Sequence, residues 1–268
     1  VMLWYWTIRG VMYQKCISWE PRLTLKAYES ALKTAYFCRR TASKGLYSMF
    51  RKLDSDKDVT YAFCLSSADF FIISRNDDLK IEKYGLSLVE KSTLYTPVFT
   101  IPRGWNLAME EAFNNLLNSK FEKELLPRIV YDDLCWESVD WSIFEAMRGN
   151  IRKKFYPVAR SIGSDPKTVK SHFYGRVLPS CVVLNYFFPK GYSSYQQAFL
   201  NVTTNYEKSF VDALTCLPCT TYIYVLEKSL VLGLFHDSIE LLLSTIEKME
   251  EKAIIDDYLL YCPLAYSR

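Results

Sequence analysis

Short apolar runs with a period of two alternate with runs of helical period along residues 35–101. Runs of the first kind predict strands, whereas apolar residues spaced three and four apart predict helices. The predicted order is strand, helix, strand, strand, helix, strand. The strands are expected at residues 35–40, 60–65, 70–74 and 93–101, and the helices at residues 44–53 and 78–90.

The second half of the chain repeats this order with similar residues. Segments that match in the same order indicate two copies of one fold, and make coincidence among short strands a poor explanation. The matching pairs are AYFCRRT at 35–41 with AFLNVTT at 198–204, FFIISRNDDL at 70–79 with LVLGLFHDSI at 230–239, and LYTPVF at 94–99 with LYCPLA at 260–265.

Each copy is expected to form a four-stranded antiparallel sheet with two helices on one face, the ferredoxin-like plan. The other face of each sheet needs a cover, because its residues are apolar and aromatic. Two such faces can bury each other, either within one chain or between chains. The residues expected on these faces include Tyr36, Phe63 and Phe71 in the first copy and Phe199, Tyr222 and Tyr224 in the second.

Between the copies, residues 152–176 carry the pattern of two short helices joined by a tight turn. Gly163 suits the left-handed position that ends the first helix. Asp165 can cap the second helix, and Pro166 fits its first position, where a missing N–H costs nothing. A leading helix is expected at residues 140–148, with Asp140 as its cap. The inward-facing residues are expected to be Val158, Ala159, Ile162, Val169, Phe173 and Val177.

This predicted helix-turn-helix is strongly basic. Between Arg148 and Arg176 there are eight Lys or Arg residues and one acid, in a chain whose net charge is only +3. A basic face on such a motif is typical of proteins that bind duplex DNA. The alternative is a basic helical hairpin that is merely solvated, since short helix-turn-helix patterns often arise without function.

Composition narrows the class of protein. The chain has 268 residues, of which 50% are hydrophobic and 16% aromatic, which favours a globular fold over disorder. No apolar run approaches the roughly 18 residues of a membrane span, and the start lacks the features of a signal peptide. We therefore expect a cytoplasmic protein without a membrane partner.

The eight cysteines give little sign of a metal or redox site. Only Cys216 and Cys219 have the C-x-x-C spacing of a redox pair or of half a zinc site, and a second pair is absent. Isolated cysteines more often act as small apolar residues. We expect no cofactor and no metal.

Three segments resemble the Lrp/AsnC family of transcription regulators, also called feast/famine regulators. They are DWSIF at 140–144, VARSIGSDPKTVKSHF at 158–173 and CVVLNYFFPKGY at 181–192. In that family a helix-turn-helix is joined to a βαββαβ effector and oligomerisation module, known as the RAM module. The resemblance implies an α+β chain with two ferredoxin-like modules in tandem and a winged-type helix-turn-helix domain between them. The implied divisions are a first module at 1–103, a connecting helix at 104–126, a DNA-binding domain at 127–180 and a second module at 181–268.

The resemblance also implies roles for individual residues. The recognition helix would present Lys167, Thr168, Lys170, Ser171, His172 and Tyr174 to the DNA bases, and Arg152, Lys153, Lys154 and Arg176 would contact phosphates. The turns between the middle strands, where the family binds effectors, place Ser67, Asp69, Glu227 and Ser229 as candidate effector ligands.

The sequence thus predicts a sequence-specific regulator that binds double-stranded DNA and is not an enzyme. It would form a homodimer or a larger assembly through its modules, with an amino acid or other small effector as a candidate ligand. Two alternatives stay open. One is an enzyme similar to the siroheme decarboxylases, with His236 and the adjacent Asp237 as its acid–base pair. The other is a ligand-sensing or oligomerisation scaffold whose helix-turn-helix is vestigial.

Overall fold

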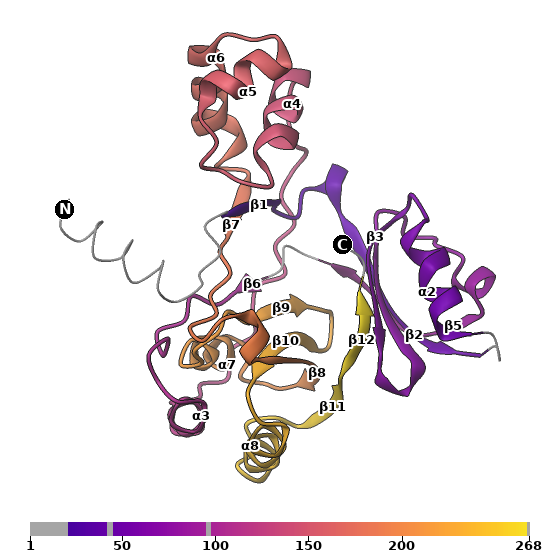
Figure 1. The fold of residues 1–268 in the computed structure, drawn as a ribbon. Helices are drawn as coiled ribbons and strands as arrows, with labels where there is room; N and C mark the ends of the chain where they lie inside the picture. Colours follow the sequence, from indigo (N-terminus) through magenta and orange to yellow (C-terminus); the bar gives the residue numbers. More distant parts are fainter. Residues whose placement is uncertain (1–20, 42–44, 95–97, 267–268) are drawn as a thin grey trace.

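The fold is seen in a computed structural model that describes residues 21–41, 45–94 and 98–266 (Figure 1). It combines helices with antiparallel sheets, which confirms the predicted α+β class. Two five-stranded sheets pack face to face, and a helical domain lies at one end of the molecule. In the described ranges, no helix is long and apolar enough to cross a membrane.

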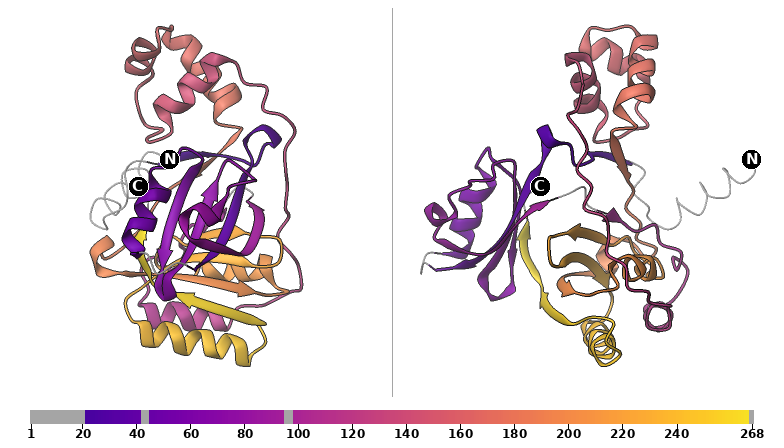
Figure 2. Two further views of the ribbon diagram at one scale, coloured as in Figure 1. Left: turned by 90° about the vertical axis from the view of Figure 1, so that its right-hand side faces the viewer. Right: turned by 180° about the vertical axis from the view of Figure 1, so that it is seen from behind.

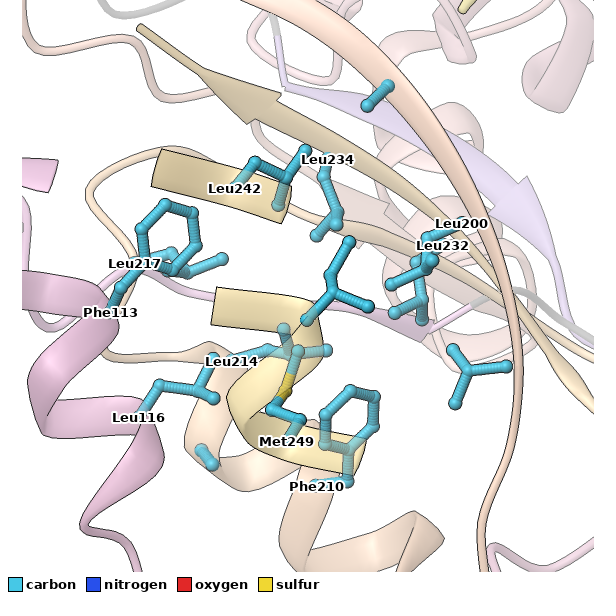
Figure 3. Close-up of a cluster of buried hydrophobic side chains, with 14 of the residues drawn as sticks. Phe113, Leu116, Leu200, Phe210, Leu214, Leu217, Leu232, Leu234, Leu242 and Met249 are labelled. Atoms are coloured by element: carbon cyan, nitrogen blue, oxygen red, sulfur yellow. The ribbon is translucent and has the colours of Figure 1, made fainter. Parts of the chain in front are cut away.

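The sheet of the second repeat has the strand order β11-β8-β10-β9-β6. Helices cover the face that carries its largest apolar cluster, as shown in Figure 3. Leu200, Leu232 and Leu234 from the strands meet Phe210 and Leu242 from the helices there. The elements are β8 (Gln196–Thr203), α7 (Glu207–Leu214), β9 (Tyr222–Val225), β10 (Leu230–His236), α8 (Ile239–Glu251) and β11 (Asp257–Tyr261), with α3 (Met109–Leu117) packed beside α7 and α8.

The sheet of the first repeat has the order β12-β3-β4-β2-β5. This order matches the second sheet when the latter is listed from its other edge, as β6-β9-β10-β8-β11. The helix predicted at residues 78–90 is wrong. A short 3-10 helix, η3 (Ile81–Tyr84), ends at Gly85 with φ of 79°, and the chain then pairs along β2. The elements are β2 (Lys33–Arg40), α2 (Leu46–Asp54), β3 (Val59–Leu65), η2 (Ser66–Ala68), β4 (Asp69–Ser74) and β5 (Leu86–Leu94).

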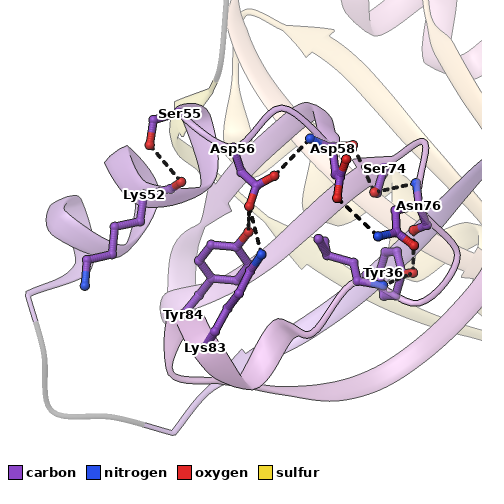
Figure 4. A network of polar contacts seen from close by, with 10 residues as sticks. Tyr36, Lys52, Ser55, Asp56, Asp58, Ser74, Asn76, Lys83 and Tyr84 are labelled. Atoms are coloured by element: carbon purple, nitrogen blue, oxygen red, sulfur yellow. Dashed lines mark hydrogen bonds and ion pairs between the residues drawn. The ribbon is translucent and has the colours of Figure 1, made fainter.

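A polar network holds η3 in place (Figure 4). The Asp56 carboxylate accepts hydrogen bonds from the Tyr84 hydroxyl, from Lys83 Nζ at 2.9 Å and from the Asp58 backbone N–H at 2.9 Å. These bonds, led by the one from Tyr84, lower the pKa of Asp56 to about 2. Two consecutive residues of η3 are thus bound to the loop after α2, which explains why a continuous helix does not form.

Each sheet gains its fifth strand from the other repeat. After β5, β6 (Val98–Phe99) pairs with β9, and after β11, β12 (Pro263–Tyr266) pairs with β3. Figure 1 shows the yellow β12 beside the purple β3. Each sheet therefore has five strands, one more than the four that were predicted.

The two sheets bury their aromatic faces against each other within one chain (Figure 2). The closest ring pair is Phe63 with Phe199, whose centroids are 4.2 Å apart. The expectation for Tyr36 is wrong, because its ring lies in the helix-side cluster and its hydroxyl donates to Asn76 O at 2.8 Å. Association of two chains stays a prediction.

A two-stranded ribbon connects the sheets to the helical domain. It consists of β1 (Arg22–Leu25), which precedes the first repeat in the chain, and β7 (Cys181–Leu184), which precedes the second repeat. The strands are antiparallel, with Arg22 opposite Leu184. Two short 3-10 helices, η1 (Glu29–Ala31) and η5 (Tyr192–Ser194), precede the first long strand of each repeat.

The helical domain (residues 138–177) forms largely as its local signals predict. Gly163 has φ of 67° and ends α5, and the Asp165 side chain accepts from the Lys167 N–H at 2.8 Å with Pro166 at the first position of α6. Asp140 is not the cap of α4: Glu137 holds that position, and Asp140 bonds back to it from within the first turn. The helices are α4 (Ser138–Met147), α5 (Phe155–Ile162), α6 (Pro166–His172) and the π-helical turn η4 (Phe173–Val177).

Between α3 and α4 the chain is extended, so the connecting helix predicted over residues 104–126 is shorter than expected. Residues 118–131, here called the strap, are fixed to α7 by a buried ion pair. Arg128 Nη2 donates to Glu207 Oε1 at 2.7 Å and to Leu226 O at 2.7 Å, and Arg128 Nη1 contacts the other carboxylate oxygen. Farther along, the Tyr131 N–H donates to Ala27 O at 2.7 Å.

Candidate functional site

Tyrosine side chains gather where the two sheets meet, next to the β1–β7 ribbon. Ring centroids lie 5.6 Å apart for Tyr186 and Tyr222, and the pKa of the Tyr222 phenol is raised in part by the phenols of Tyr186, Tyr224, Tyr61 and Tyr192. Tyr266 in turn acts on Tyr61 and Tyr192. We call this group the tyrosine cluster. Its members are Tyr61 from β3, Tyr186 after β7, Tyr192 from η5, Tyr222 and Tyr224 from β9, and Tyr266 from β12.

Strand β9 shows how the sequence builds this cluster. Successive side chains of a strand point to opposite faces. Ile223 and Val225 enter the helix-side core, and Tyr222 and Tyr224 alternate with them. Tyr224 packs in the cluster between the sheets, whereas Tyr222 lies against Tyr186 and Phe235. Gly233 lies directly opposite Tyr222, where a Cβ atom would be 2.8 Å from Tyr222 Cδ2. Glycine at this position therefore leaves the space that the Tyr222 ring occupies.

One guanidinium group accompanies the phenols. Arg22, at the start of β1, holds its Cζ atom 5.8 Å from the centroid of the Tyr186 ring, a cation–π contact. Its charge also opposes the rise in the pKa of Tyr61 and Tyr186. In the described ranges, Arg22 is the basic residue whose charge acts on the phenols of the cluster.

Burial keeps the phenols of Tyr61, Tyr186, Tyr192, Tyr222 and Tyr224 neutral at physiological pH, because it raises the pKa of each. Burial, helped by neighbouring phenols, raises the pKa of Tyr61 to about 12, and burial also raises the pKa of Tyr186, Tyr222 and Tyr224 above the usual value. The side facing solvent is formed by Tyr192 and Tyr266, which are 51% and 41% exposed. Neutral hydroxyl donors, aromatic faces and one fixed cation suit a flat ligand that carries carboxylates.

The residues predicted to bind DNA lie on the helical domain. Lys167, Thr168, Lys170, Ser171 and Tyr174 are exposed on α6 and η4, and Arg152, Lys153 and Lys154 are exposed before α5. Three of these residues contact α4 or its cap. Lys153 Nζ donates to Ala146 O at 2.6 Å, His172 Nδ1 lies 2.8 Å from Asp140 Oδ1, and Arg176 Nη1 donates to Glu137 Oε1 at 2.7 Å and to Asp140 Oδ2 at 3.1 Å. Their polar groups are therefore engaged inside the helical domain.

The environment of Asp140 makes the stability of the helical domain depend on pH. Its burial raises the pKa, but hydrogen bonds from the Glu137 N–H, His172 and Arg176 outweigh that effect and lower it below the usual value. A lowered pKa contributes stability above the unfolded value near 3.9, and that stability is lost as the pH falls through the folded value. Asp140→Asn should cost about 2–4 kcal/mol at pH 7 and progressively less below about pH 4.

Urea unfolding at several pH values, followed by helical circular dichroism, measures this difference. Asp165→Asn is the control, because asparagine caps a helix as well as aspartate does. A cost for Asp140→Asn that stays constant from pH 7 to about pH 3 would contradict the role assigned to the carboxylate.

The candidate effector ligands lie in two separate turns. Asp69 is buried at the start of β4, 3.5 Å from Arg39 Nε, and Ser67 precedes it with φ of 67°. In the second repeat, the Glu227 N–H donates to Ser92 Oγ at 3.0 Å, and Ser229 is buried. Neither turn contributes a side chain to the tyrosine cluster, and effector binding by these residues stays a prediction.

The proposed acid–base pair of His236 and Asp237 does not form. His236 is 1% exposed at the end of β10, and burial lowers its pKa. Asp237 instead pairs with Lys190 at 2.9 Å. Because Phe235 lies with Tyr192 and Tyr222, the next residue, His236, points to the opposite face of the sheet. This histidine is therefore directed away from the tyrosine cluster.

The Cys216–Cys219 pair also gives no reactive site. Cys219 is buried, and burial raises the pKa of its thiol to about 12, so it is not a thiolate at neutral pH. Within the part of the chain that the structure covers, no group of three or more His, Cys, Asp or Glu side chains could hold a metal ion.

Comparison with known proteins gives matches in structure alone. No family model matches the chain, and no curated protein does. The solved structures that it resembles are of a siroheme decarboxylase. The crystal structure of the siroheme decarboxylase NirDL aligns with 98% of this chain and 81% of its own, with a TM-score of 0.56 and 9% identity. NirDL in complex with an iron-uroporphyrin III analogue aligns with 97% and 80%, with a TM-score of 0.51 and 8% identity.

These matches overturn the main functional prediction. The fold that suggested an Lrp/AsnC-type transcription regulator is shared along nearly the whole chain with structures of a siroheme decarboxylase, an enzyme. The predictions of DNA binding and of a protein that is not an enzyme are therefore wrong, and the enzyme alternative has the better support. The physical reason is that a helix-turn-helix with a basic face is a fold-level feature and does not fix function.

The sequence analysis missed the tyrosine cluster as a site. Its residues come from β3, β9, β12, η5 and the segment after β7, so no local motif contains them. The available signals were the high tyrosine content, 20 of 268 residues, and the alternation of Tyr222 and Tyr224 with aliphatic residues.

Proposed function

We propose that this chain is an enzyme that binds a tetrapyrrole carrying carboxylate groups at the tyrosine cluster and removes carbon dioxide from it, as a siroheme decarboxylase does. The cluster of aromatic rings and neutral phenols beside Arg22 carries the proposal. It is supported by the likeness to NirDL along nearly the whole chain. We further propose that each repeat is a ferredoxin-like module and that the helical domain is a helix-turn-helix of winged type.

The residues of the cluster suit the binding step. Tyrosine rings offer faces for a flat macrocycle, and their hydroxyl groups donate hydrogen bonds to carboxylates. Arg22 can hold one carboxylate with two parallel N–H donors, the geometry that guanidinium groups favour. Its place at the start of β1 puts this cation at the end of the cluster nearest the ribbon.

The reaction needs a proton at the carbon that loses its carboxylate. The C–C bond breaks, carbon dioxide leaves, the electron pair stays on the carbon, and that carbon takes up one proton. Tyr61, whose pKa burial raises to about 12, keeps its proton at neutral pH, and the carbanion left by carbon dioxide is basic enough to take a proton from so weak an acid. Tyr192 and Tyr266 lie on the solvent side and can return a proton to the cluster.

The proposal is tested by titrating the protein with iron uroporphyrin III and following the absorption of the macrocycle. Arg22→Gln should weaken binding by about tenfold to a hundredfold, because a hydrogen-bonded charge is worth roughly 1.5–3 kcal/mol. Arg51→Gln is the matched control, since Arg51 also lies over a tyrosine ring, that of Tyr47, at 6.0 Å but on α2.

Incubation with siroheme, followed by mass spectrometry, then tests the reaction, with loss of carbon dioxide as the expected result. Absence of binding, or equal affinity in the Arg22 and Arg51 variants, would contradict the site. Tight binding with no loss of carbon dioxide would contradict the decarboxylase assignment alone.

A further inference from the structure

The chain contains only two histidines, and neither can serve a ligand bound at the tyrosine cluster. His172 lies in the helical domain, with Nδ1 2.8 Å from Asp140. His236 is buried at the end of β10, and strand alternation points it to the face opposite to Phe235, which lies beside Tyr192 and Tyr222. An iron atom held among these tyrosines therefore has no imidazole within reach.

We propose that the iron of a ferric tetrapyrrole bound at the cluster takes the phenolate oxygen of Tyr186 as its axial ligand. This inference rests on the proposed function. Tyrosine is an established protein ligand of haem iron, alongside histidine, cysteine and methionine. The phenolate is a hard oxygen donor, which suits ferric iron.

Tyr186 is favoured over the other members by its position. Tyr222 is confined over Gly233, Tyr224 packs against Phe71 with centroids 5.5 Å apart, and Tyr192 interacts with the Tyr266 hydroxyl. Tyr186 has Arg22 over its ring, and in the described ranges its hydroxyl makes no hydrogen bond. Its oxygen is therefore available, and a cation stands beside it.

Ligation exchanges a proton for the metal. The O–H bond of Tyr186 breaks, the oxygen keeps the electron pair and binds ferric iron, and the proton passes to solvent. The oxidation state of the iron does not change. Arg22 stabilises the resulting negative oxygen, and within the described ranges the phenols that interact with Tyr186 are those of Tyr61, Tyr222 and Tyr224.

Resonance Raman spectra of the complex with ferric uroporphyrin III test the assignment directly. Excitation of the phenolate-to-iron transition should enhance tyrosine ring and iron–oxygen vibrations. Tyr186→Phe should remove these bands, while metal-free uroporphyrin III, followed by its fluorescence, still binds. Tyr206→Phe is the control, because Tyr206 lies at the start of α7 beside Phe121, away from the cluster.

The proton balance gives a second measurement. Affinity for ferric uroporphyrin III should rise about tenfold for each pH unit, since one proton leaves on binding, and affinity for the metal-free macrocycle should not. Tyr186→Phe should abolish this difference between the two macrocycles.

The outcomes separate the two proposals. Phenolate bands that persist in Tyr186→Phe, or an imidazole-type spectrum that His236→Gln removes, would overturn the ligation and leave the tetrapyrrole site intact. Binding of both macrocycles with no phenolate bands would do the same. If neither macrocycle binds, the proposed function fails, and the ligation fails with it.

Discussion

Glu207→Ala is expected to lower the free energy of unfolding by about 3–5 kcal/mol, because it removes the buried carboxylate that holds Arg128 and the Leu126 N–H. Glu207 is only 3% exposed, and its carboxylate accepts from Arg128 and from the Leu126 N–H at 2.8 Å. The same guanidinium donates to Leu226 O, so this ion pair joins the strap to α7 and to the turn after β9. Its loss should release the strap from the second repeat.

Urea denaturation measures this effect, and hydrogen exchange of the strap locates it. Glu124→Ala is the matched control on the same segment, because Glu124 pairs with Lys208 but both side chains are about half exposed. Exposed pairs contribute only about 0–1 kcal/mol. Similar losses for the two variants would mean that the buried pair adds nothing beyond a surface contact.

Gly233→Ala is expected to cost about 1–3 kcal/mol and to reduce affinity for iron uroporphyrin III by about tenfold or more. The new methyl group would stand 2.8 Å from Tyr222 Cδ2, a distance that forces the ring or the strand to move. Tyr222 contacts both Tyr186 and Phe235, so its displacement disturbs the centre of the cluster.

Two comparisons isolate the clash. Gly149→Ala should leave stability and binding nearly unchanged, since no atom lies within 4 Å of the added Cβ position. Tyr222→Ala combined with Gly233→Ala should recover part of the lost stability, because the collision is gone, but not the affinity. Full affinity in Gly233→Ala would show that the Tyr222 ring has no part in binding.

Features fixed by neighbouring residues were accessible from the sequence. Gly163, Asp165 and Pro166 act within one turn of the chain, and all three hold their predicted places. The repeat of short segments also identified related strands, because β4 and β10 occupy equivalent positions in the two sheets.

Features that depend on distant partners were not accessible. Residues 78–90 have a helix-like pattern, but Tyr84 and Lys83 bind Asp56, and the segment from Leu86 onward pairs with β2. The exchange of β6 and β12 depends on the two sheets standing face to face. The tyrosine cluster follows from that same arrangement, so a site built from both repeats could not be read from either.

The functional error had a different origin. Most basic residues of 152–176 are exposed, but the step from a basic helix-turn-helix to duplex DNA rested on the charge and pattern of the motif, which many unrelated helical hairpins share. His172 and Arg176 are examples. Their positions in the sequence fit contacts with DNA equally well as the contacts with Asp140 and Glu137 that the structure shows.

Because β6 pairs with β9 and β12 pairs with β3, each five-stranded sheet contains one strand from the other half of the chain. A gene carrying only one half would encode a sheet with an empty edge, and strand edges of that kind invite unwanted pairing. The covalent link between the halves therefore supplies each sheet with its fifth strand from the same polypeptide, so the two halves are always present at a ratio of one to one. It also allows the two halves to differ in sequence, so that Tyr186 and Tyr192, both from the second half, lie on one side of the interface.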